Sequence, residues 1–159
     1  MKLVIDSAKF TREKEQLHGT LPIASLGRLT QSVHSHAGEM QYAIQGGIDE
    51  WSRPTLHLVL RGELALLCQR CLMPMPFTVS VDTTLVLFAS EEAIDIAQSD
   101  DPEIEGILFD DSLDAVALVR EELILALPYA PVHQQCGIDG MVKSEKLNPF
   151  AVLATLKQK

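Results

Sequence analysis

The stretch Phe77–Phe88, with the sequence FTVSVDTTLVLF, decides the fold because large apolar residues recur at every second position. Successive side chains of a β-strand point to opposite faces, so this spacing gathers them on a single face. That row comprises Phe77, Val79, Val81, Thr83, Leu85 and Leu87. The opposite row begins with Thr78, Ser80 and Asp82. The alternation predicts a strand with one buried face in an antiparallel sheet.

Two more strands are predicted before this one. The sequences EMQYAIQGGI, at Glu39–Ile48, and TLHLVLRGELALLCQRC, which starts at Thr55, form a strand region around the turn sequence DEWSRP. The chain from Cys68 to Pro76 then connects the second strand to the third. Pro74 and Pro76 lack the N–H group that a sheet requires, which favours a loop at this point.

The clearest helix is predicted from about Ser112 to Leu127, where Pro128 ends the pattern. Asp111 or Ser112 can cap its first amides. The residues expected to form one stripe along this helix are Leu113, Val116, Ala117, Arg120, Leu123, Ile124 and Leu127. All of these residues except the arginine are apolar, so the stripe predicts a helix packed on the sheet.

Shorter helices are expected toward the two ends of the chain. Ser7 can cap a first helix that Gly19 can end. At the other end, Asn148 can cap a helical tail over residues 148–159, in which Pro149 suits the first position. A helix of that length is unstable alone. We therefore expect the tail to dock on the domain or to become ordered on a partner.

The segment 89–109 is expected to be a flexible loop. Its sequence, ASEEAIDIAQSDDPEIEGILF, holds few large side chains for burial, and its like charges repel one another. A short edge strand at EGILF could close the loop. The segment also explains most of the net charge of −9, because twelve of the 22 acidic residues lie between Glu91 and Glu122. The rest of the chain is slightly positive, so the negative total does not exclude a basic surface for nucleic acid.

The length of 159 residues fits a single domain over 1–159. Three cysteines are too few for a disulfide framework. No secretory signal and no apolar run near the ~18 residues of a membrane span is visible. These features predict a cytoplasmic protein with no membrane partner. The expected fold is α+β, with an antiparallel sheet or partial β-barrel, a packed helix and a mobile acidic loop.

The cysteines suggest a metal site. Cys68-x2-Cys71 and His133-x2-Cys136 share one spacing and could supply three thiolates and one imidazole to tetrahedral zinc. Buried thiols are the alternative, because free cysteine behaves as a small hydrophobe. A redox pair is disfavoured, since the first pair follows a strand and not the helix start that lowers a thiol pKa. Leu72 follows this pair where glycine would wrap a metal more easily.

No catalytic motif is present. Gly46-Gly47 lacks the lysine and the helix of a phosphate loop, and no nucleophile elbow is found, so we predict that the protein is not an enzyme. Aromatic residues make up only 5% of the chain, which argues against a base-stacking platform. RNA would instead be contacted through phosphates and shape. The basic residues proposed for RNA or partner contact are Arg70, Lys143, Lys146, Lys157 and Lys159. The alternative is that these are ordinary surface charges.

Three stretches together resemble a known family. CQRCLMPMPF, LDAVALVREELILALPYAPVHQQC and the terminal NPFAVLATLKQK are similar to the YceD family of bacterial large ribosomal RNA accumulation proteins, over about Gly62–Lys159. The resemblance implies a role in the synthesis, processing or stability of large-subunit ribosomal RNA and no known catalytic activity. The residues shared with the family are Cys68, Arg70, Cys71, Glu121, Glu122, Leu127, Pro128, His133 and Cys136. Many relatives carry a second cysteine pair where this chain has only Cys136. This departure weakens the zinc interpretation, because either His133 is the fourth ligand or a ligand is missing.

Two functions follow as hypotheses. In the first, the protein binds large-subunit ribosomal RNA or a pre-ribosomal particle. In the second, it is a small protein-interaction module whose acidic segment engages a basic ribosomal protein. Within the family resemblance, Arg70 either contacts RNA or forms a salt bridge with Glu121 or Glu122.

Overall fold

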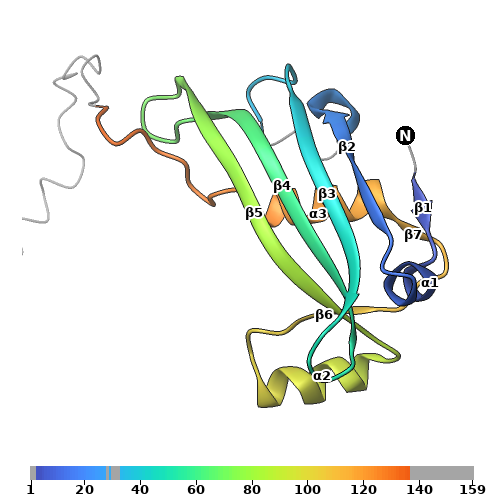
Figure 1. Ribbon diagram of the computed structural model, residues 1–159. Coiled ribbons are helices and arrows are strands. Elements are labelled where there is room, and N and C mark those ends of the chain that lie inside the picture. The colour runs from blue at the N-terminus through green and yellow to red at the C-terminus, as the bar shows by residue number, and fades with distance from the viewer. Residues whose placement is uncertain (1–2, 28, 30–32, 137–159) are drawn as a thin grey trace, which may run out of the picture.

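The computed structural model describes residues 3–27, 29 and 33–136. It has the expected α+β fold, with α3 lying across one face of a twisted sheet (Figure 1). The main sheet contains β2 (Gln16–Pro22), β3 (Glu39–Ile48), β4 (Pro54–Leu67), β5 (Pro74–Phe88) and β6 (Glu105–Leu108). A smaller sheet pairs β1 (Val4–Ile5) with β7 (Leu113–Asp114). The helices are α1 (Ser7–Arg12), the 3-10 turn Ile23–Ser25, α2 (Glu91–Asp100) and α3 (Ala115–Leu125).

The strands of the main sheet lie in the order β2-β3-β4-β5-β6. The first four pair antiparallel, and the three predicted strands, β3, β4 and β5, are among them. β6 is the exception, because it runs parallel to β5. Parallel neighbours require a crossover, and α2 supplies it. The sheet is therefore mixed, and over the described residues it stays open, with β2 and β6 at its edges, and does not close into a barrel.

One face of the sheet forms the core. The alternation predicted for β5 is confirmed, because Val79 and Leu85 are buried while Ser80 and Asp82 are exposed. The inward row of β4 is made of Leu56, Leu58, Leu60, Leu64 and Leu66, all of them buried. Burial of such a side chain stabilises the fold by about 1.5–3 kcal/mol. α3 covers this row, and Leu123 is fully buried in the same cluster.

The N-terminal helix is shorter than predicted. α1 ends at Arg12, and Lys14 follows with a positive φ of 53°, so the helix stops there. Leu17 and Gly19 lie in β2 because that segment pairs with β3. The predicted cap, Ser7, is also wrong. The Asp6 carboxylate accepts the hydrogen bond from the Lys9 backbone N–H, at 2.9 Å.

α1 reaches the sheet at a glycine. A Cβ added to Gly46 would lie 2.2 Å from the Phe10 carbonyl oxygen, so no larger residue fits beneath the helix. This close approach buries the Phe10 ring in the core. Gly46 therefore serves helix packing.

α3 begins later than predicted. Its first residue is Ala115, and the Asp114 carboxylate, not Asp111 or Ser112, accepts from the first backbone amides. The residues before it are drawn into β7, which pairs Leu113 with Ile5. The buried face is also rotated from the predicted stripe. Its buried residues are Ala115, Val116, Leu118, Val119 and Leu123.

The expectation of a loop over 89–109 does not hold for residues 91–100, which form α2. The Ser90 hydroxyl accepts from the Ala93 N–H at 3.3 Å, and two glutamates in the first turn suit the positive end of the helix dipole. The predicted edge strand at EGILF is confirmed as β6. α2 rests on this strand, where a Cβ at Gly106 would meet the Ile94 side chain at 2.8 Å.

The predicted helical tail, 148–159, lies outside the described residues, and so do Lys143, Lys146, Lys157 and Lys159. Within the described residues, none of the helices has the length and apolar character needed to cross a membrane.

Candidate metal centre

Two segments that are distant in the sequence meet at one end of the sheet. The first is the connection 68–73 between β4 and β5, and the second is the chain that follows α3 and passes beside it (Figure 1). The Gln69 N–H donates to the Pro131 carbonyl oxygen at 2.8 Å, which fixes one segment against the other. The tie brings the two predicted ligand pairs together.

The four predicted ligands form a compact group. The sulfur atoms of Cys68 and Cys71, the sulfur of Cys136 and a ring nitrogen of His133 all lie within 4.8 Å of one another. The Cys68 and Cys136 sulfurs are 3.6 Å apart, and the Cys71 sulfur is 3.4 Å from His133 Nδ1. Sulfur atoms around tetrahedral zinc, each about 2.3 Å from the metal, are separated by about 3.8 Å. The group therefore has the size and the donor set of a zinc site.

The group also has the electrostatics of a cation site. Burial raises the pKa of Cys68, but hydrogen bonds from the backbone N–H groups of Cys71, His133 and Arg70 lower this pKa to about 5. The largest single influence on the pKa of Cys71 is a hydrogen bond from the Met73 backbone, which lowers it. Burial and the neighbouring sulfurs of Cys68 and Cys136 together outweigh this bond, so the pKa of Cys71 is raised. Several thiolates ionise side by side only with a positive charge between them. A metal ion would supply that charge.

Arg70 holds the second pair in place. Its Nε donates to the Cys136 sulfur at 3.0 Å, and a terminal nitrogen donates to the His133 carbonyl oxygen at 2.8 Å. The hydrogen bond to the sulfur, helped by the charges of the three cysteines, raises the pKa of Arg70. The predicted salt bridge from Arg70 to Glu121 or Glu122 is absent among the described residues. Its role as a positioning residue could not be read from the sequence, which shows only that it lies between two cysteines.

The turn that carries the first pair contains a strained residue. Leu72 adopts a positive φ of 59°, a conformation that costs about 1–2 kcal/mol for residues other than glycine. Its N–H donates to the Cys68 carbonyl oxygen at 2.9 Å, which closes the turn. The backbone therefore adopts the wrap expected of a metal-binding turn although leucine stands in place of glycine.

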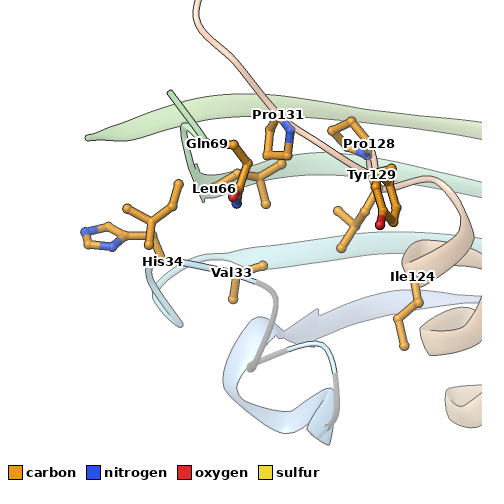
Figure 2. Close-up of a pocket in the computed structure, with 10 residues that line it drawn as sticks. Val33, His34, Leu66, Gln69, Ile124, Pro128, Tyr129 and Pro131 are labelled. Atoms are coloured by element: carbon orange, nitrogen blue, oxygen red, sulfur yellow. The ribbon is translucent and has the colours of Figure 1, made fainter. Parts of the chain in front are cut away.

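A pocket of about 430 Å³ lies beside this group. Gln69 and Pro131, which join the two segments, form part of its wall, and Figure 2 shows Tyr129 and His34 on opposite sides of it. Tyr129 is fully exposed. The walls come from β4, from the chain after α3 and from residues near Val33, so no single stretch of sequence indicates the pocket.

The alternatives for the cysteines can now be compared. Cys68 is fully buried, as the buried-thiol interpretation requires, but Cys71 and Cys136 are only half-buried. The pair Cys68–Cys71 follows a strand and does not begin a helix, so the helix N-terminus typical of redox cysteines is missing here, although backbone N–H groups still lower the pKa of Cys68. The convergence of all four ligands favours metal binding over both alternatives.

Comparison with known proteins identifies the family. The model of the family described as "Large ribosomal RNA subunit accumulation protein YceD" matches residues 56–157. A protein of that name from Haemophilus influenzae is 33% identical over 178 aligned positions, which cover all of this chain and 97% of the relative. The chain belongs to the YceD family. No solved structure gives a significant match.

The YceD match includes every ligand of the candidate metal centre. Residues 56–157 run from β4 through α3 and contain both halves of the group as well as Arg70. The name of the family implies a role in accumulation of the RNA of the large ribosomal subunit.

Proposed function

We propose that this YceD protein supports the accumulation of large-subunit ribosomal RNA by binding the RNA or a pre-ribosomal particle in the cytoplasm, without catalysing a reaction. The observation that carries the proposal is the family match over residues 56–157. The geometry is compatible with a binding protein, because the one group of His, Cys, Asp and Glu side chains close enough to hold a metal among the described residues offers four potential ligands.

We further propose that Cys68, Cys71, His133 and Cys136 bind zinc. Four protein ligands leave no open position for a substrate, which is typical of structural zinc sites. When bound, the ion would supply a cross-link and no reaction chemistry. It would tie the β4–β5 connection to the chain after α3, which is already joined to it through Gln69.

This cross-link would matter for RNA contact. The four lysines proposed as contacts follow Cys136 in the sequence, so the metal group would fix the point from which that basic segment departs. Arg70 is exposed at the same point and bonds to both His133 and Cys136. Phosphate contacts by these side chains would give affinity without sequence readout.

A complementation experiment tests the biological role. In cells that lack the protein, we expect the ratio of large-subunit to small-subunit ribosomal RNA to fall and the wild-type chain to restore it. Cys136→Ser should restore it poorly, and Leu125→Ser, a change at an exposed residue of α3, should restore it fully. An unchanged ratio in the deletion strain would contradict the proposed function.

A salt titration tests the mode of action. If several lysines contact phosphates, affinity for a large-subunit RNA fragment falls steeply as salt rises, by roughly one unit of log–log slope for each contact. Deletion of residues 148–159 should reduce that slope. Retention of ribosomal proteins by the purified chain, without binding of RNA at low salt, would favour the protein-interaction hypothesis instead.

Metal analysis tests the zinc site. Purified wild-type protein should contain about one zinc per chain by mass spectrometry, and Cys136→Ser should contain much less. Loss of a residue that orients metal ligands typically weakens metal binding about 10–100-fold. Arg70→Ala should therefore lose its zinc to a chelator at a lower chelator concentration than the wild type. Arg61→Ala, on the exposed face of β4, is the matched control and should behave as wild type. Substoichiometric zinc in the wild type would refute this part of the proposal.

A further inference from the structure

A second pocket lies at the opposite end of β4 from the metal group. It has a volume of about 520 Å³ and is formed by the turn 49–53 and α2. Because β4 spans 14 residues, this pocket is about 45 Å from the connection 68–73. Its apolar wall consists of Trp51, Phe88, Ala93, Ile96, Ala97 and Ile104.

Trp51 is held in position although it is exposed. The Asp49 carboxylate accepts from the backbone N–H groups of Trp51 and Arg53, at 3.0 and 2.7 Å, which makes the turn rigid. The Arg53 guanidinium lies 4.7 Å from the centre of the indole ring. The ring nevertheless remains 66% exposed. An exposed tryptophan that is already ordered is the type of side chain that anchors protein interfaces, because little further entropy is lost on binding.

α2 presents apolar side chains that the protein does not use for its core. None of its residues is buried, and Ile96 is 66% exposed. The helix is held instead by its contact with β6, where Ile94 packs on Gly106. The Ile96 side chain is therefore available beside Trp51.

The rim of this pocket is acidic. Asp100 and Asp101 line it, and the chain has no lysine or arginine between Glu91 and Val119. The one basic residue of the wall, Arg53, is already paired with the Asp49 carboxylate at 2.6 Å. Phosphate groups would be repelled by this surface, whereas a lysine or arginine would be attracted to it.

We propose that this pocket docks a basic segment of a partner protein. The segment would insert a leucine, isoleucine or phenylalanine between Trp51 and Ile96 and place lysine or arginine against Asp100 and Asp101. An apolar anchor surrounded by complementary charge is a usual arrangement for such recognition. The inference goes beyond the proposed RNA binding, since the pocket and the metal group lie at opposite ends of the sheet.

The position of Trp51 provides a direct test, because it is the only tryptophan of the chain. We would titrate the full-length protein with a short amphipathic peptide that carries leucine on one face and lysine on the other, and follow tryptophan emission. We expect a saturable change. A peptide with glutamate in place of lysine, and one with alanine in place of leucine, should each bind at least about tenfold more weakly.

Variants identify the surface. Ile96→Ser should weaken peptide binding about tenfold, and so should the double change Asp100→Asn with Asp101→Asn, which keeps the size of both side chains. Leu125→Ser and Asp111→Asn alter an exposed leucine and an exposed aspartate elsewhere and should bind as wild type.

Three results would overturn the proposal. The first is wild-type affinity in Ile96→Ser, and the second is equal binding of the glutamate peptide. The third is displacement of the lysine peptide by a large-subunit RNA fragment that itself changes tryptophan emission, which would assign the pocket to RNA. None of these measurements depends on ribosomal RNA levels or on metal, so failure here is separate from failure of the proposed function.

Discussion

β4 lies between two turns that share a design. In the turn 49–53, the Asp49 carboxylate accepts from two backbone N–H groups, and Ser52 adopts a positive φ of 62°. In the connection 68–73, the Cys68 sulfur faces the backbone N–H groups of Arg70 and Cys71, and Leu72 adopts a φ of 59°. Each turn thus has one acceptor at its start and one residue in the left-handed region.

The two turns differ in what completes them. The first is closed by its own residues, because Arg53 also pairs with the Asp49 side chain at 2.6 Å. The second also has a closing bond of its own, from the Leu72 N–H to the Cys68 carbonyl oxygen, but a distant segment holds it as well. That segment acts through the bond from Gln69 to Pro131 and the bond from the His133 N–H to the Cys68 sulfur, at 3.4 Å. A carboxylate is fully charged at neutral pH without help, whereas a cluster of thiolates requires a cation. The comparison teaches that one end of β4 is held by its own turn, whereas the other depends on tertiary structure and, under the proposed function, on a bound metal.

Metal removal should therefore have the largest effect on thermal stability, and it should act only on the end of β4 that carries the connection 68–73. A strong chelator should lower the Tm of the wild type by on the order of 10 °C, since loss of a structural metal removes folding free energy. Cys71→Ser should melt near the chelated wild type and should not respond to chelator. Asp49→Asn should keep the full response, because its change lies at the other end of β4. Circular dichroism melts with and without chelator measure this, and superimposable wild-type melts would contradict it.

Asp49→Ala should break the self-contained turn. The side chain is mostly buried, and its loss removes two backbone hydrogen bonds and a charged pair with Arg53. We expect the free energy of unfolding to fall by about 1.5–3 kcal/mol. Urea denaturation measures the difference, with Asp111→Ala as a control that should change it by less than about 0.5 kcal/mol. Equal losses in the two variants would show that the turn does not depend on its carboxylate.

The same carboxylate predicts a dependence on pH. Burial raises the pKa of Asp49, but hydrogen bonds from Arg53 and Trp51 and the charge of Arg53 lower this pKa below its usual value. Its contribution to stability is thus complete above the unfolded pKa of about 4 and disappears as the pH falls through the folded pKa. Unfolding free energies of wild type and Asp49→Asn should differ by a constant amount from neutral pH to about pH 4 and converge below it. A constant gap down to the lowest accessible pH would rule out this linkage.

Leu72→Gly should have the smallest effect and the opposite sign. Glycine removes the strain of the positive φ, and the leucine side chain is 70% exposed, so little burial is lost. We expect a gain of about 0.5–1 kcal/mol after the greater entropy of unfolded glycine is subtracted. Ser52→Gly should show a similar gain at the other turn. Met73→Gly, at an exposed neighbour without a positive φ, should lose stability, and a gain there would discount the strain argument.

Local sequence patterns predicted what depends on local structure. The strand Glu39–Ile48 and the inward row of β5 follow from alternation alone. α2 was missed because none of its residues is buried and its sequence holds few large apolar side chains. Ser90 followed by two glutamates is nevertheless a signal for a helix start. The start of α3 was placed too early because Leu113 and Asp114 belong to β7, whose partner β1 lies near the other end of the chain.

The candidate site also has a part that local sequence predicts and a part that depends on contacts between distant residues. Spacing and residue type selected the four side chains that the structure brings together, because metals impose those preferences on any fold. The bonds of Arg70 to Cys136 and His133 were not predictable, since more than 60 residues separate the partners. The pocket at Trp51 was also missed, because it requires the crossover that sets α2 beside the turn 49–53.

The position of α3 near the end of the fold affects how a growing chain can fold. β5 is complete at Phe88, but the helix that covers the leucine row of β4 ends only at Leu125. Translation proceeds at about 5–20 residues per second, so the sheet waits on the order of seconds for its cover. The bond from the Ala115 N–H to the Leu3 carbonyl, at 2.8 Å, can close only then. Until that moment, the leucine row of a nascent chain lacks the helix that covers it in the finished fold, so exposure of this apolar face would last longer when synthesis is slower.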